Sequence, residues 1–149
     1  MGEQQLTRRL ATIIVADIVS YSRLMEHDEA GTLQRLQAMR NEVVFPQTQR
    51  FRGRIVKTTG DGWLAEFASV TDAVRSSIEI QDAMALRNES LPRDQRLEVR
   101  IGINLGEIIF EGDDIYGTGV NVAARLESLA APGGVCISGA VHRKICGKI

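Results

Sequence analysis

The feature that most constrains the fold is the run Leu10–Ile18, which is apolar and rich in β-branched residues. Such a run is typical of a strand that is buried on both of its faces. Asp17 interrupts the run, so a carboxylate stands near the carboxyl end of this predicted strand.

A helical pattern follows this strand, from Ser22 onward. After Asp28, apolar residues recur every three or four positions, and Pro46 is expected to kink or end the helix. The apolar face of this first helix comprises Leu33, Leu36, Met39, Val43 and Val44. Ser69 can cap a second long helix, because a serine side chain accepts hydrogen bonds from the free amides of a first turn. The apolar face of the second helix comprises Val70, Ala73, Val74, Ile78 and Met84.

The remaining segments predict strands and two shorter helical stretches. Residues 54–59 and 63–67 form the arms of a hairpin, and alternating apolar residues between Leu97 and Leu105 predict a half-buried strand. Gly106 is expected to turn the chain back through residues 107–110. A helix over 121–129, a short strand over 135–138 and a final helical turn complete the chain.

This order of elements predicts an α+β fold, a ferredoxin-like α/β sandwich with helices packed on a mixed, mostly antiparallel sheet. The first strand, the long helix and the strand over 54–59 form a β-α-β crossover, so the two strands should run parallel. Asp17 lies near the carboxyl end of the first strand, and Asp61 lies in the turn after the second. Both carboxylates are therefore expected at the same edge of the sheet, although they are far apart in the sequence.

Each aspartate on its own has a simpler interpretation. Asp17 can cap the helix that follows, and Asp61 with Gly62 matches the Asp-Gly pair of a tight hairpin turn, in which both residues tolerate positive φ. Together at one sheet edge, the two carboxylates better match a metal site. Mg²⁺ takes a few hard oxygen ligands and leaves its other positions to water and phosphate.

Composition argues against several other classes of function. The 149 residues suffice for one domain, and 18 basic against 19 acidic residues give a net charge of −1, which offers no electrostatic basis for binding nucleic acid or a membrane. Asp17 interrupts the longest apolar run, and the start of the chain is too polar for a signal peptide. Cys136 and Cys146 lack metal-ligand spacing, so we expect reduced thiols in a cytoplasmic protein.

Three blocks of the sequence resemble the signature motifs of the class III nucleotidyl cyclase catalytic domain, in the same order. They are ADIVSYSRL at 16–24, KTTGDGW at 57–63 and DDIYGTGVNVAARLE at 113–127. The third block is the most specific, because its pattern G-x-x-V-N-x-A-x-R is long and has no general structural reason. The resemblance runs from residue 10 to the end of the chain.

The resemblance implies a palm-type cyclase homology domain of bacterial type, in which Asp17, Asp61 and the backbone carbonyl of Ile18 bind two Mg²⁺ or Mn²⁺ ions. One ion would activate the ribose 3′-hydroxyl and the other would hold the triphosphate, so that the oxygen attacks the α-phosphorus and pyrophosphate leaves. Phosphate would also be bound at a helix start by the amides of Val19, Ser20, Tyr21 and Ser22. The family usually has glycine where Ser20 stands.

The third block and the lysine of the second imply the remaining roles. Asn121 would orient the ribose, and Arg125, one helical turn later, would stabilise charge on the α-phosphate. Lys57 and Asp114 would select the base, because a donor and an acceptor complement the ring nitrogen and amino group of adenine. The resemblance thus implies an adenylate cyclase that makes 3′,5′-cyclic AMP from ATP. A guanylate cyclase is the alternative, and Lys57 argues against it.

The same resemblance implies a head-to-tail homodimer with two shared sites, in which one chain supplies the aspartates and the other supplies the base-selecting pair with Asn121 and Arg125. Residues 1–149 are expected to form a single catalytic domain that lacks the family's C-terminal strand pair and its triphosphate-binding lysine, so the fragment can be weakly active or inactive. A regulatory domain is expected after residue 149 or on another chain.

Two further alternatives belong to other classes of function. A non-catalytic nucleotide-binding or dimerisation domain is disfavoured, because degenerate cyclase domains lose a metal aspartate or the Asn–Arg pair and neither is lost here. A diguanylate cyclase would have a GG-acid-acid-F loop, which is absent from the sequence.

Overall fold

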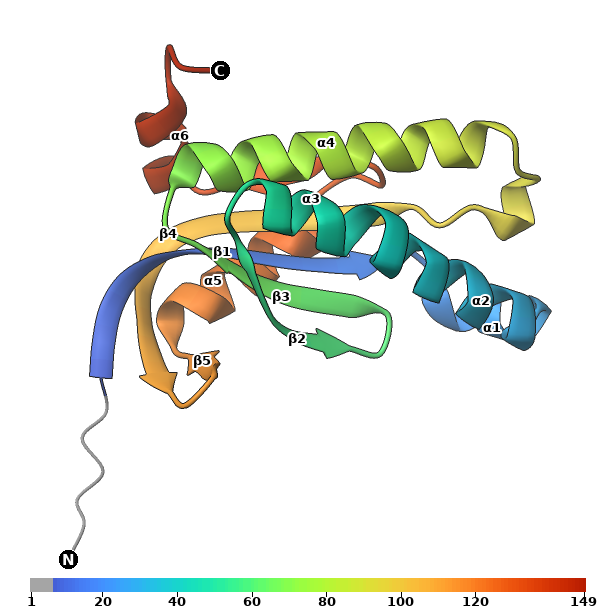
Figure 1. Ribbon diagram of the computed structural model, residues 1–149, viewed down its shortest axis with the longest axis horizontal. Helices are drawn as coiled ribbons and strands as arrows, with labels where there is room; N and C mark the ends of the chain where they lie inside the picture. The colour runs from blue at the N-terminus through green and yellow to red at the C-terminus, as the bar shows by residue number, and fades with distance from the viewer. Residues whose placement is uncertain (1–6) are drawn as a thin grey trace, which may run out of the picture.

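The computed structural model in Figure 1 describes residues 7–149. The first six residues of the predicted domain, which include most of the polar start of the chain, lie outside the described residues. The strands are β1 (Thr7–Ile18), β2 (Arg54–Thr59), β3 (Gly62–Phe67), β4 (Val99–Glu111), β5 (Asp114–Tyr116) and β6 (Val135–Ile137). The helices are α1 (Tyr21–His27), α2 (Glu29–Met39), the π-helical segment η1 (Arg40–Val44), α3 (Phe45–Arg50), α4 (Val70–Glu89), the 3-10 turn η2 (Arg93–Gln95), α5 (Thr118–Leu129) and α6 (Gly139–Ile145).

Strand β1 lies at the centre of the sheet, whose order is β2-β3-β1-β4-β5. Both neighbours of β1 run antiparallel to it, and β2 runs antiparallel to β3. Strands β1 and β2 therefore point the same way with β3 between them, as the predicted crossover requires. Strand β6 adds to β4 in parallel, so the predicted α+β fold with a mixed, mostly antiparallel sheet is confirmed.

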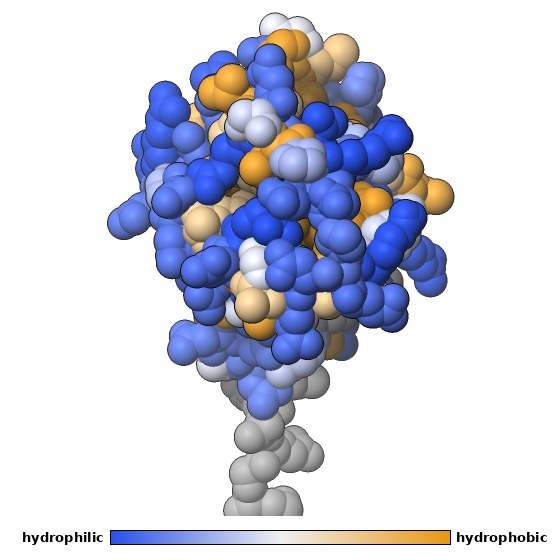
Figure 2. Space-filling model, turned by 90° about the vertical axis from the view of Figure 1, so that its right-hand side faces the viewer, coloured by the Kyte–Doolittle hydropathy of each residue, from blue (hydrophilic) through white to orange (hydrophobic). Residues whose placement is uncertain are grey.

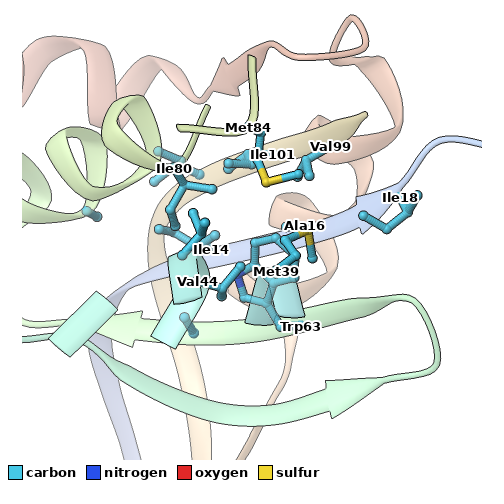
Figure 3. Close-up of a cluster of buried hydrophobic side chains, with 14 of the residues drawn as sticks. Ile14, Ala16, Ile18, Met39, Val44, Trp63, Ile80, Met84, Val99 and Ile101 are labelled. Carbon is cyan, nitrogen blue, oxygen red and sulfur yellow. The ribbon is translucent and has the colours of Figure 1, made fainter. Parts of the chain in front are cut away.

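Strand β1 is buried on both faces, as its sequence predicts. Ile14 belongs to the larger core, where it packs with Met39 and Ile80 from the helices on one side of the sheet (Figure 3). Ile13 belongs to a second, smaller core on the opposite face, which α5 covers. Leu10 is an exception, because it is 66% exposed, and the doubly buried part of the strand begins one residue later.

The sheet curls until its two edge strands meet. Strands β2 and β5 stand at opposite ends of the strand order, yet Arg54 on β2 donates a hydrogen bond to the Asp113 carbonyl at 3.0 Å. Beside this bond, Lys57 on β2 lies 3.2 Å from Asp114 on β5. The smaller core combines side chains from these strands with α5, so it lies inside the curl.

The helical region between β1 and β2 is a series of short segments. Asp28 begins α2, and its side chain accepts a hydrogen bond from the Gly31 amide at 3.1 Å. Pro46 does not end the helix: it lies in the first turn of α3, which continues directly from the π-helical segment η1. Leu33 is 41% exposed and was wrongly assigned to the apolar face. Thr32 is buried instead, with its hydroxyl bonded to a carbonyl of α1.

Two other predictions are corrected by the structure. Ser69 caps α4 as expected, and its side chain accepts a hydrogen bond from the Asp72 amide at 3.2 Å. Ile78 does not belong to the buried face of α4, because it is 39% exposed, and that face includes the buried Ser76 and Ser77 instead. Gly106 does not turn the chain. It pairs with Ala11 in the middle of β4, because β1 extends far enough for the ladder to continue, and the hairpin turn comes only after Glu111.

The structure also bears on membrane-spanning helices and on the two cysteines. No helix within residues 7–149 is both long and apolar enough to cross a membrane. Cys136 and Cys146 are free thiols, so neither is bound in a disulfide.

Glu66 is a buried carboxylate that lies between two arginines of neighbouring strands. It is 8% exposed and forms ion pairs with Arg9 and, at 3.0 Å, with Arg54. Burial alone would raise the pKa of Glu66, but the two guanidinium groups outweigh burial and hold that pKa below its ordinary value.

We expect Glu66→Gln to lower the free energy of unfolding by about 2 kcal/mol at pH 7, because hydrogen bonds to a charged group are lost. Since the folded-state pKa of Glu66 is the lower one, its contribution is complete above the unfolded value of 4.5 and is lost as the pH falls through the folded value. Urea titrations of both proteins at pH 7 and pH 3 measure this. An equal difference at the two pH values would contradict it.

Candidate active site

Asp17 and Asp61 come together at one edge of the sheet, as predicted. Asp17 lies at the end of β1 and Asp61 in the turn between β2 and β3, and strands β1 and β2 point the same way in Figure 1. The amide of Ile18 donates a hydrogen bond to Oδ2 of Asp61 at 3.3 Å. The carboxylate in the turn is thereby tied to the backbone at the end of β1.

The turn that carries Asp61 differs in register from the predicted one. Gly60 and Asp61 are its two central residues, and of these Gly60 alone has a positive φ, of 38°. Gly62 already belongs to β3, where a Cβ would lie 2.2 Å from the carbonyl oxygen of Ala16. The missing side chain lets β3 begin directly beside the end of β1, and this close approach brings Asp61 to Ile18.

Arg40, which the sequence analysis did not identify, holds this turn from the helical layer. Its Nη2 donates to the carbonyl of Gly60 at 2.8 Å and to that of Gly62 at 3.0 Å. Both carbonyls that flank Asp61 are thus bonded to one guanidinium. Arg40 begins the π-helical segment, an irregularity that often occurs at functional sites. A single arginine within a predicted helix gives no sequence signal of this contact.

Two more charged residues that the sequence analysis missed lie behind Asp17. Arg100 stands directly opposite Asp17 in the β1–β4 ladder, with its Nε 3.7 Å from Oδ1 of Asp17. The same Nε lies 3.8 Å from Oε1 of Glu127 on α5, a residue that is 5% exposed. Burial, followed by the neighbouring Asp17 carboxylate, raises the pKa of Glu127 to about 8. The available signal was the place of Glu127 one turn after Ala123, on the apolar face of the helix.

The residues at this edge fit a divalent cation of the Mg²⁺ or Mn²⁺ kind. Asp17, Asp61 and the carbonyl of Ile18 are hard oxygen donors, and Oδ1 of Asp17 is buried without a hydrogen-bond partner among the described residues. Within residues 7–149, no three His, Cys, Asp or Glu side chains gather as metal ligands do. Two carboxylates leave the other coordination positions to water or phosphate, as Mg²⁺ prefers.

Lys57 and Asp114 form a second group, where the curled sheet brings β2 to β5. The Nζ of Lys57 lies 3.2 Å from Oδ2 of Asp114 and 5.7 Å from the centre of the Tyr116 ring. The amide of Ile115 donates to Asp114 at 2.8 Å, and this bond, together with Tyr116 and Lys57, holds the pKa of Asp114 below its ordinary value. Lys57 and Asp114, which the sequence predicts to select the base together, are thus adjacent within one chain.

Asn121 and Arg125 lie on the other side of α5 from the residues that pack on the sheet. Both are exposed, whereas Ala123 and Glu127 are buried. Residues two positions apart on a helix do not share a face. The helix that brings Glu127 to Asp17 therefore directs Arg125 away from it, and a single chain does not unite the two groups.

The junction between β1 and α1 differs in part from the prediction. The amide of Val19 donates to the Glu98 carbonyl at 2.8 Å and is not free to bind phosphate. Ser20 has a φ of 55°, in the left-handed region that glycine adopts at lower cost, which is a physical reason for a glycine at this position. The amides of Tyr21 and Ser22 belong to the first turn of α1, where the helix itself supplies no acceptor.

Figure 2 shows the right-hand side of the molecule in Figure 1, the end at which helices α1 and α2 lie. This surface is covered mainly by hydrophilic residues, with only small hydrophobic areas.

Comparison with known proteins shows which family this chain is similar to. The family described as the adenylate and guanylate cyclase catalytic domain matches residues 4–147. Putative adenylate cyclase 3 of Rhizobium meliloti is 48% identical over 148 residues, which are 99% of this chain and 25% of that protein. An adenylate cyclase of Streptomyces coelicolor is 32% identical over 147 residues, which are 96% of this chain and 36% of that protein.

A solved structure agrees with these matches. The adenylate/guanylate cyclase/hydrolase of Silicibacter pomeroyi superposes with a TM-score of 0.90 and 46% identity, covering 97% of this chain and 84% of that one. The chain spans only a quarter to about a third of the length of the two curated relatives, at 25% and 36%.

We expect Arg40→Ala to loosen the turn that carries Asp61. Two hydrogen bonds to a charged donor would be lost, and about 1.5 kcal/mol of local stability corresponds to roughly tenfold faster amide exchange. Hydrogen exchange followed by mass spectrometry over residues 57–63 measures it. Arg35→Ala is the matched control, because Arg35 lies on α2 and pairs with Asp28 instead. Unchanged exchange in the Arg40 variant would show that the turn is held by other contacts.

Proposed function

This chain belongs to the family of adenylate and guanylate cyclase catalytic domains, and we propose that it is an adenylate cyclase, which converts ATP to 3′,5′-cyclic AMP and pyrophosphate. The observation that carries the proposal is the adjacency of Lys57 and Asp114 in a domain whose two aspartates share one sheet edge. The relatives that are named adenylate cyclases support the choice of ATP.

The aspartates would serve the reaction by holding cations. Asp17, Asp61 and the Ile18 carbonyl would hold two Mg²⁺ or Mn²⁺ ions, which when bound lower the pKa of the ribose 3′-hydroxyl and neutralise the triphosphate. The hydrogen bond from the Ile18 amide to Asp61 supports this role, because it fixes one carboxylate beside the strand end that carries the other.

The helix residues would act on the sugar and the phosphates. Arg125 would donate hydrogen bonds to the α-phosphate oxygens as negative charge builds on them, and Asn121 would hold the ribose in place for in-line attack. The amides of Ser20, Tyr21 and Ser22 would donate to the triphosphate, whereas that of Val19 is already used by Glu98.

Lys57 and Asp114 would choose the base. Lysine donates to the ring nitrogen of adenine that lacks a hydrogen, and the carboxylate accepts from the exocyclic amino group. Guanine presents a ring N–H and a carbonyl oxygen at the corresponding positions. The lysine donor would then face the ring N–H, and the aspartate acceptor would face the carbonyl oxygen. This mismatch favours ATP over GTP.

A head-to-tail homodimer is part of the same proposal. Arg125 and Asn121 are exposed on α5 and are directed away from the aspartates of their own chain, which supports their use at the site of a second copy. Each dimer would then hold two equivalent sites. A cytoplasmic location accords with ATP as the substrate and with two free cysteines.

Product analysis with each nucleotide tests the reaction and the base choice. Incubation of the chain with Mn²⁺ and ATP should give cyclic AMP and pyrophosphate, resolved by chromatography, with little cyclic product from GTP. Asp114→Ala should lower kcat/KM for ATP by about 10- to 100-fold, the cost of an unpaired polar group. Asp113→Ala is the control, since among the described residues its side chain forms no hydrogen bond or ion pair and its backbone carbonyl accepts from Arg54. Preference for GTP would refute the choice of ATP, and neither product from a chain extended by the family's C-terminal strand pair would refute the reaction.

Complementation tests the shared sites. Mixed in equal amounts, Asp61→Ala and Arg125→Ala chains should recover about a quarter of wild-type activity, because half of the dimers are hybrids and each hybrid has one intact site. Each variant alone should be nearly inactive. Sedimentation would verify that hybrids form, and hybrids without activity would show that each site belongs to one chain.

A further inference from the structure

Asp17 belongs to a partly buried cluster of three ionisable side chains, and the other two members, Arg100 and Glu127, have no part in the proposed mechanism. The Nε of Arg100 stands between Oδ1 of Asp17, at 3.7 Å, and Oε1 of Glu127, at 3.8 Å. Each of these three atoms is buried and has no hydrogen-bond partner among the described residues. Burial of this kind is costly for charged groups, so their arrangement calls for a physical reason.

The position of Glu127 is fixed by the backbone. Helix α5 packs so closely on β4 that a Cβ at Gly102 would lie 2.3 Å from the amide nitrogen of Glu127 and 2.4 Å from the carbonyl of Ala123. Gly102 lies two residues after Arg100, on the same face of the strand. Because no side chain separates helix from strand, Glu127 is held at a constant distance from the guanidinium of Arg100.

The distances in the cluster indicate what Glu127 does for Asp17. A direct bond between a guanidinium and a carboxylate measures about 2.7–2.9 Å, and both distances from Arg100 are well above this range. Arg100 is therefore shared between two carboxylates and is fully paired with neither. Asp17 faces Arg100, yet its carboxylate does not form a close ion pair with Arg100 that would compete with a cation.

We propose that Glu127 is a positioning residue for the metal-binding carboxylate of Asp17, acting through the guanidinium of Arg100. Glu127 draws Arg100 toward α5, which orients Asp17 from behind and leaves it able to bind a cation at the sheet edge. The inference rests on the proposed function, because it assigns a metal-binding role to Asp17.

Binding of Mn²⁺ alone, without nucleotide, tests this role separately from turnover. The signal of free Mn²⁺ in electron paramagnetic resonance would be titrated for the wild type, Glu127→Gln and Glu127→Ala. Loss of a residue that supports a metal ligand weakens metal binding by about 10- to 100-fold, and we expect a weakening of about tenfold for Glu127→Ala. Glu127→Gln should weaken binding less, because its amide oxygen can still face the guanidinium of Arg100.

Glu66→Gln is the matched control, because Glu66 is another buried carboxylate. It pairs with Arg9 and Arg54 and not with Arg100. The Glu66→Gln variant should leave the Mn²⁺ dissociation constant unchanged. Circular dichroism and thermal melts establish that each variant is folded. If Glu127→Ala does not fold, the comparison of Glu127→Gln with Glu66→Gln decides, and only the first should weaken binding.

Two failures would be distinguishable. If the wild type binds Mn²⁺ and makes cyclic AMP, but the Glu127 variants bind Mn²⁺ as it does or Glu66→Gln weakens binding equally, the positioning role is wrong and the proposed function stands. If the wild type neither binds Mn²⁺ nor forms cyclic nucleotide, the proposed function fails and the inference fails with it.

Discussion

The site depends on one constraint, the burial of β1 on both faces and its pairing on both edges. A strand enclosed in this way cannot easily shift its register, since a slip of one residue would move every side chain into the opposite core, where the space does not match its size. Its end is therefore fixed against two other segments, with Ala16 opposite Trp63 on β3 and Asp17 opposite Arg100 on β4. Residues distant in the sequence thus become fixed neighbours of one carboxylate.

The curl of the sheet and the two faces of α5 divide the polar residues into separate groups. Closure of the sheet onto α5 brings β2 beside β5 and so assembles Lys57 with Asp114. The buried face of α5 carries Glu127 toward Asp17, while its exposed face carries Arg125. The packing of α5 that places Glu127 near Asp17 therefore leaves Asn121 and Arg125 exposed. These two residues, expected to act on the nucleotide, remain available to a second molecule.

What could be predicted from the sequence follows from local or topological rules. The meeting of Asp17 and Asp61 follows from the crossover, and the caps Asp28 and Ser69 follow from bonds within one turn. Arg40 could not be found, because it acts on a partner far away in the chain and an arginine in a helix usually faces solvent. Glu127 also acts on a distant partner, and its place on the apolar face of α5 was the only signal of its burial. The Val19 amide was misassigned for the same reason, since its acceptor precedes β4.

The charges around Asp17 link the stability of this edge to the binding of a cation. Two carboxylates share one guanidinium in a partly buried place, and such a group carries an excess of negative charge that burial makes unfavourable. A proton on Glu127 relieves the excess from within, as its raised pKa of about 8 indicates. A divalent cation at Asp17 would relieve it from the solvent side. A ligand that binds only the folded state stabilises that state. The excess negative charge that destabilises this edge would therefore also favour binding of the cation that neutralises it.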